Sequence, residues 1–175
     1  MTKRAAVIAA STVLIALLAI YGINYLGLQR FADDVVGSDP RDSGIRMSVH
    51  YAYYVDPEDI VVDLRSVENA SKLDVTRVLL QTAAKLSGRQ FDHVYLASRG
   101  KRRFMLLGSY FRQVGLEYPR QNPMYTIRTM PENVLGLNGE HPYQTWTGGI
   151  LGVLAQQMRD FSDFEDRWFA AENRS

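Results

Sequence analysis

The chain has 175 residues, including 20 Lys or Arg and 19 Asp or Glu, and it contains no cysteine. The absence of cysteine excludes disulfide bonds, thiolate catalysis and zinc sites built on thiolates. Beyond residue 28, 18 basic residues stand against all 19 acidic ones, a formal charge of −1, which argues against electrostatic binding to nucleic acid.

Residues 5–28 form an uninterrupted apolar segment, and we predict that they cross a membrane as one helix. The segment has no Asp, Glu, Lys, Arg or Pro, and eleven of its residues are Leu, Ile or Val. A helix of this length reaches about 36 Å, enough for a hydrocarbon core about 30 Å thick. Tyr21 and Tyr25 fall near its end, where aromatic rings favour the headgroup layer.

The charges around this segment predict its orientation. Lys3 and Arg4 precede it, whereas Asp33, Asp34 and Asp39 follow. The positive-inside rule then places residues 1–4 in the cytoplasm and the rest of the chain outside it, in the periplasm if the source is bacterial. A cleaved signal peptide is the alternative. It is disfavoured because the apolar run exceeds 7–15 residues and no clean small-x-small cleavage site ends it.

Residues 29–46 predict a polar tether, because Asp, Gly, Ser and Pro cluster there and the apolar periodicity is lost. A soluble domain over residues 47–171 and a C-terminal tail at 172–175 complete the predicted organisation. The domain opens with alternating residues 47–55, a turn at 56–59 and a second strand at 60–67, which together predict a hairpin.

A helix is predicted to begin after Ser71, whose hydroxyl can cap it together with Asp74, and to end at Gly88. Strands at 91–98 and 102–107 follow, joined by a tight turn at Gly100. Residues 108–146 are irregular, with an edge strand suggested by Met124, Ile127 and Met130, and an amphipathic helix closes the chain at 147–171. The fold class is therefore α+β, with an antiparallel sheet in ββα-ββα order and helices packed on one face.

The residues that carry chemistry give no recognisable active site. His50, His93 and His141 lack metal-ligand spacing, so we predict no metal and no cofactor. Ser98 and Lys101 match an SxxK spacing, but they straddle a predicted turn rather than a helix. The carboxylates at 160, 163, 165 and 166 are expected to be solvated, and the chain is predicted not to be an enzyme.

Two surfaces are candidates for binding. The basic turn, which contains Arg99, Lys101, Arg102 and Arg103, is either a solvated turn or a contact for anionic headgroups or an acidic partner. The loop region predicts a partner interface because aromatic and Met side chains gather there. Its candidate residues are Tyr118, Met124, Tyr125, Met130, Tyr143 and Trp146.

The function predicted from these features is that of a single-pass membrane-anchored accessory or assembly protein, which presents a small extracytoplasmic domain for protein–protein contacts. The alternative is a membrane-tethered module that binds a lipid or another apolar ligand. A membrane-attached hydrolase ranks third, because it requires a nucleophile beside His50 or His93.

Overall fold

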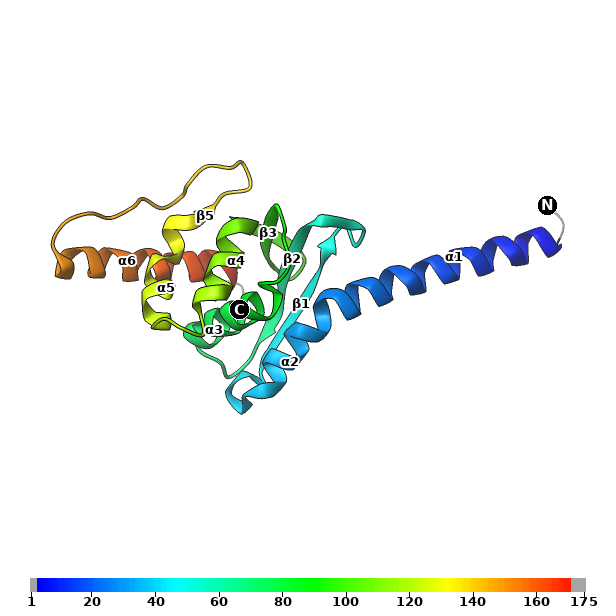
Figure 1. Ribbon diagram of the computed structural model, residues 1–175, viewed down its shortest axis with the longest axis horizontal. Helices are drawn as coiled ribbons and strands as arrows, with labels where there is room; N and C mark the ends of the chain where they lie inside the picture. The colour runs from blue at the N-terminus through cyan, green and yellow to red at the C-terminus, as the bar shows by residue number, and fades with distance from the viewer. Residues whose placement is uncertain (1–2, 171–175) are drawn as a thin grey trace.

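The computed structural model describes residues 3–170. An α+β domain stands at one end, and a long helix projects from it toward the N-terminus (Figure 1). The helices are α1 (Lys3–Asn24), α2 (Arg30–Ser38), α3 (Lys72–Leu86), α4 (Gly108–Glu117), α5 (Pro123–Thr129) and α6 (Ile150–Glu165). The strands are β1 (Ile45–Ala52), β2 (Asp56–Val67), β3 (His93–Ser98), β4 (Lys101–Leu107) and β5 (Val134–Leu135).

The five strands form one sheet in the order β1-β2-β3-β4-β5. All neighbours are antiparallel except β2 and β3, which run parallel. The predicted all-antiparallel sheet is therefore wrong, and the sheet is mixed. The reason is that α3 connects β2 to β3 and returns the chain to the end of the sheet at which β2 began. A connection between parallel strands must make such a crossover.

One hydrophobic core lies between the sheet and the helices. Alternate residues such as Ile60, Val62 and Leu96 point from the strands into this core, where they meet the buried faces of the helices. Ser71 caps α3 as predicted: its side chain accepts a hydrogen bond from the Asp74 N–H, and the Asp74 carboxylate accepts one from the Ser71 N–H. At the chain's end, Trp168 is fully buried and donates from Nε1 to the carbonyl of Ala97 over 3.0 Å.

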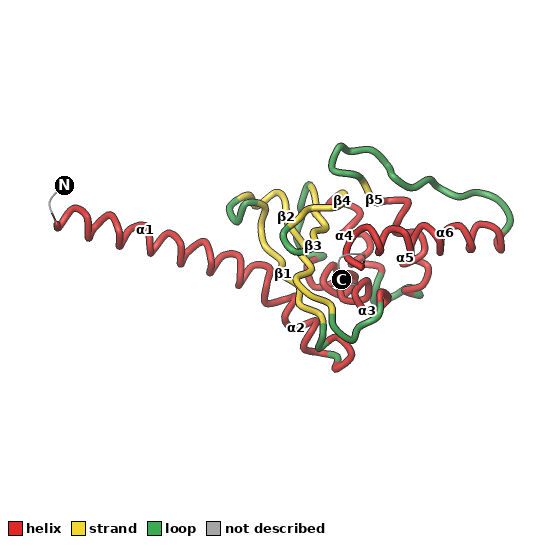
Figure 2. The backbone as a smooth tube through the Cα atoms, turned by 180° about the vertical axis from the view of Figure 1, so that it is seen from behind, coloured by secondary structure: helices red, strands yellow, loops and turns green. Residues whose placement is uncertain are grey.

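The predicted tether at 29–46 is replaced by structure that packs on the domain. The helix continues from α1 through a π turn at Tyr25–Gln29 into α2, and Figure 2 shows it unbroken as far as the edge of the sheet. Leu28, Ala32 and Val35 recur at helical spacing and are buried in the core. Irregular chain begins only after Ser38, with a short 3-10 turn at Pro40–Asp42.

Three local predictions also differ from the structure. The first hairpin turns at Tyr53–Val55, so the predicted turn at 56–59 lies inside β2. Met124 and Ile127 belong to the α5 region, which begins after the Asn122 cap with Pro123 in its first turn, so no strand forms there. The edge strand is instead β5, and the stretch at 108–146 also holds α4. The last helix starts at Ile150, and the predicted tail at 172–175 lies outside the described residues.

Candidate functional site

The most distinctive arrangement in the molecule is the junction between the long helix and the edge strand β1. Asn24 Oδ1 accepts from the Tyr51 N–H, and its Nδ2 donates to the Tyr54 carbonyl, each over 2.8 Å. Gln29 repeats the pattern, because its Oε1 accepts from the Val49 N–H over 2.7 Å and its Nε2 donates to the Met47 carbonyl over 3.0 Å. Two side-chain amides therefore satisfy backbone groups that an edge strand leaves unpaired.

The π turn brings these two amides to the same side of the helix. Asn24 immediately precedes the turn and Gln29 ends it, five residues later, and the i to i+5 pattern of a π turn allows both side chains to reach β1. Asn24 is almost completely buried although it follows a run of apolar residues. The junction thus marks the point where the exposed apolar helix ends and the domain begins.

A groove opens beside this junction. Its volume is about 480 Å³, and it runs between the helix and β1. Its lining consists of Tyr21, Asn24, Tyr25, Gln29, Asp33, Ser48, Val49, His50 and Tyr54. The Tyr21 and Tyr25 rings stack at 6.0 Å, and burial lowers the pKa of His50, which favours its neutral form. The groove is therefore lined by three tyrosine rings together with polar side chains, and no Lys or Arg is among its lining residues.

The second candidate region is the face of the sheet that the helices leave open. Arg102 projects onto this face, with its guanidinium 4.0 Å from the centre of the Tyr95 ring and 4.9 Å from that of Tyr53. The His50 ring stacks on Tyr54 at 4.2 Å, and His93 Nδ1 lies 2.9 Å from an Asp59 carboxylate oxygen. The pattern is that of a cation–π and histidine cluster beside the first hairpin.

Ser98 and Lys101, which match the SxxK spacing, lie on either side of the turn between β3 and β4. Ser98 is buried at the end of β3, and Lys101 is exposed at the start of β4, across the turn. The turn has the predicted positive φ at Gly100, of 82°. Among the described residues, no group of three or more His, Cys, Asp or Glu side chains is placed to hold a metal ion.

Of the four cations of the basic turn, Arg99 and Lys101 are exposed, and Arg102 and Arg103 are partly buried. Arg102 is committed to the open face of the sheet, whereas Lys101 is exposed to solvent. The turn itself is held by Asp63, a buried carboxylate that accepts from the Gly100 N–H and pairs with Arg65 at 3.0 Å. This turn and the Tyr53–Val55 turn lie at opposite ends of β2. Contact of the basic turn with an anionic surface stays a prediction.

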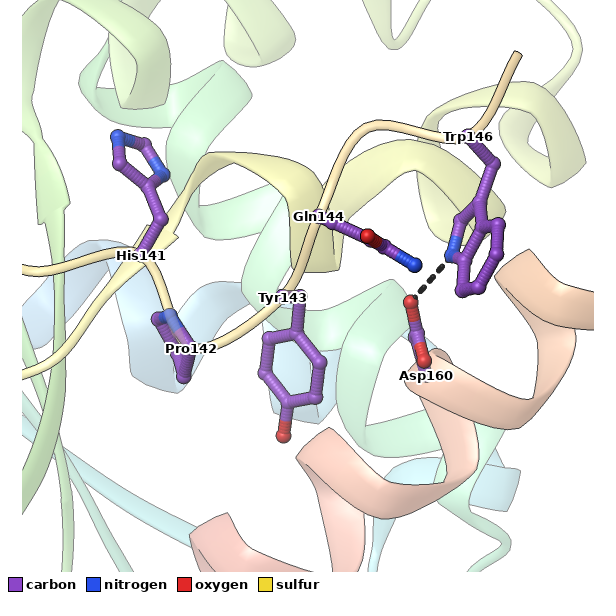
Figure 3. A pocket seen from close by; sticks show the side chains of 6 residues that line it. All are labelled: His141, Pro142, Tyr143, Gln144, Trp146 and Asp160. Carbon is purple, nitrogen blue, oxygen red and sulfur yellow. Dashed lines mark hydrogen bonds between the residues drawn. The ribbon is translucent and has the colours of Figure 1, made fainter.

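The aromatic loop and α6 border an open hollow of about 500 Å³, whose lining residues are drawn in Figure 3. Trp146 Nε1 donates to Asp160 over 2.6 Å, and the Tyr143 hydroxyl donates to Asp163 over 2.9 Å. Burial raises the pKa of Tyr143 well above its usual value, so its hydroxyl keeps its proton. Two of the acidic residues predicted to be solvated therefore serve to attach the loop to α6.

The six residues of the predicted partner interface are divided between the core and the surface. Met130 is fully buried and Tyr143 nearly so, because both pack in the core. Met124 and Tyr125 are exposed on α5, while Tyr118 and Trp146 are partly buried. Leu116 on α4 and Leu137 after β5 are also exposed large apolar residues, which the sequence reasoning missed.

A further residue that the sequence pattern misassigned is Glu165. Its side chain is fully buried, Oε1 accepts from the Thr76 hydroxyl over 2.7 Å, and no hydrogen-bond partner is found for Oε2 among the described residues. Burial raises the pKa of Glu165 to about 7. Its neighbour Asp166 is partly exposed and pairs with Lys72 at 3.0 Å.

Comparison of the chain with protein-family models, with curated proteins and with solved structures finds no significant match. Within residues 3–170, one continuous helix, Val7–Ser38, is long and apolar enough to cross a membrane.

Proposed function

We propose that the chain is a single-pass membrane protein of accessory or assembly type, whose α+β domain binds a partner protein beside the membrane and performs no catalysis. The observation that carries this proposal is the exposed apolar surface of α1. Large side chains such as Val13, Leu14 and Leu18 are exposed along it, whereas from Leu28 onward one face of the same helix is buried in the core, at Leu28, Ala32 and Val35. Apolar surface of this extent requires a cover, and a hydrocarbon core supplies one that matches its length.

The junction supports a role in presenting the domain to a partner protein. Because Asn24 and Gln29 bind the backbone of β1, the domain is held at a fixed orientation to the span. A rigid mount is useful when one face of a domain must meet another membrane protein, since less orientational freedom is lost on binding. With residues 1–4 in the cytoplasm, the domain lies on the opposite side of the membrane.

The partner surface that we favour is on α4 and α5. Leu116, Met124 and Tyr125 expose apolar and aromatic area there, and they are the residue types that protein interfaces use. A hollow of about 230 Å³ beside them, lined by Tyr110, Glu117 and Glu132 among others, offers a seat for a side chain of the partner.

The alternative function, binding of a lipid or another apolar ligand, is favoured by the groove beside the junction. Tyr21, Tyr25 and Tyr54 line it, and it lies where the apolar part of the helix ends. A ligand held there would be recognised mainly through its apolar surface.

Photo-crosslinking in intact membranes tests the proposal. A crosslinking amino acid at Tyr125 should capture one defined protein, whereas the same group at Arg120, also exposed, serves as the matched control. Alkaline carbonate washing should leave the chain in the membrane pellet. Release of the intact chain would contradict the anchor. Absence of an adduct at Tyr125, with a stoichiometric lipid in the purified protein, would favour the alternative function.

A further inference from the structure

The hairpin between β1 and β2 ends in three consecutive large side chains that face solvent. Tyr53 is 75% exposed, Tyr54 49% and Val55 63%. A tight hairpin turn normally carries Gly, Asn or Asp, because these small residues adopt positive φ values easily and are well hydrated. The composition of this tip is instead that of a surface that meets an apolar or interfacial environment.

The backbone of the tip shows that the tyrosines are placed there against local preference. Tyr53 and Tyr54 have φ values of 52° and 66°, in the left-handed region that Gly and Asn adopt more easily. Asn-Gly at these two positions would relieve that strain. The two tyrosines thus occupy this turn at a conformational cost, which indicates a role that Asn and Gly would not serve.

The tip lies beside the helix at the level where its apolar exposed part ends. The Tyr54 carbonyl accepts from Asn24, and the Tyr54 side chain lines the same groove as Tyr21 and Tyr25. In both views of the chain, the turn of the β1–β2 hairpin lies on the side of the domain from which α1 projects (Figures 1 and 2). Because the junction is fixed, the height of the tip relative to the span is fixed as well.

We infer that the Tyr53–Val55 tip is a second membrane contact, which rests in the headgroup layer of the leaflet from which α1 emerges. This inference depends on the proposed function, since it requires α1 to cross the bilayer. Tyrosine is suited to this layer, because its ring is apolar and its hydroxyl remains hydrated. The tip and the helix tyrosines then form one aromatic belt, which limits tilting of the domain.

The contact is aromatic and apolar rather than electrostatic. Asp56 and Glu58 follow the tip directly, and the nearby Arg102 is engaged with Tyr53 and Tyr95. Anionic lipid should therefore not strengthen the contact, which separates it from the binding predicted for the basic turn.

The absence of native cysteine allows a direct test with single-cysteine variants of the full chain in phosphatidylcholine nanodiscs. An environment-sensitive fluorophore is attached at Val55→Cys, at Leu14→Cys in the span, and at Lys101→Cys at the opposite end of the sheet. Quenching is then measured with lipids that carry a spin label near the headgroup and, separately, with lipids that carry it deep in the acyl chain. Tyr53→Cys is a second reporter of the tip if Val55→Cys does not fold.

We expect quenching at Val55 by the headgroup label and at Leu14 by the acyl-chain label, none at Lys101 by either label, and no change at Val55 when anionic lipid is added. If Val55 behaves like Lys101 while Leu14 remains quenched, the tip does not touch the membrane, although α1 does. If Leu14 and Val55 both report water, the membrane span fails, and this inference fails with it.

Discussion

Replacing Arg77 by alanine is expected to lower the free energy of unfolding by about 3 kcal/mol. Arg77 joins α3 to the 3-10 turn that follows the long helix, because its guanidinium pairs with Asp42 in that turn and with Asp74, the latter at 2.8 Å. Asp42 is fully buried, so removal of Arg77 leaves a carboxylate without its counter-ion in the domain interior. Thermal or urea unfolding of the full chain in detergent micelles, followed by circular dichroism, measures the effect.

Two variants distinguish the buried charge from a general loss of contacts. Arg41→Ala removes an ion pair with Asp39 in which the arginine side chain is 69% exposed, and it should change stability by less than about 1 kcal/mol. Adding Asp42→Asn to Arg77→Ala should restore part of the loss, because the orphaned group is then neutral. A loss equal to that of Arg41→Ala would show that the Asp42 pair does not hold the helix to the domain.

Replacing Glu165 by glutamine is expected to stabilise the protein above neutral pH and to remove part of its pH dependence. The folded-state pKa is about 7, against 4.5 for the exposed carboxyl. Between these values the folded state retains a proton that the unfolded state has lost, so stability falls as pH rises through this window and is level above it. The full change is on the order of 3 kcal/mol.

The experiment compares unfolding of the native chain and of Glu165→Gln at several pH values between 4 and 9. Asp166→Asn is the matched control, because that neighbouring carboxylate is partly exposed and paired with Lys72. The difference between Glu165→Gln and the native chain should grow from pH 4.5 to 7 and then stay constant. An equal difference at all pH values would mean that Glu165 does not titrate with a raised pKa.

The elements that sequence reasoning placed well are those with strong local signals. Ser71 and Asp74 defined the start of α3, and Gly100 defined the turn between β3 and β4. The crossover that makes the sheet mixed depends on where α3 packs, and no local pattern encodes that. The hairpin turn was misplaced because Pro57 indicates a turn, whereas Tyr53 and Tyr54 are unusual at positive φ.

The junction was missed for a similar reason. Polar residues from Asp33 onward obscured the helical spacing of Leu28, Ala32 and Val35, which the structure buries. Asn24 falls within the predicted span and Gln29 at the start of the predicted tether, and only the fold brings the edge of β1 against them. Glu165 likewise could not be separated from its neighbours 160, 163 and 166, since its burial arises from contact with Thr76 on a distant helix.

The most direct test of a rigid membrane mount is a distance distribution between two spin labels in the full chain in nanodiscs. One label replaces Ser11 on α1, and the other replaces Lys85 on α3 of the domain. A single narrow distribution is expected for the native junction, and the variant with Asn24→Ala and Gln29→Ala should broaden it. A broad distribution in the native chain, unchanged in the variant, would show that the domain hangs from the membrane helix on a flexible link.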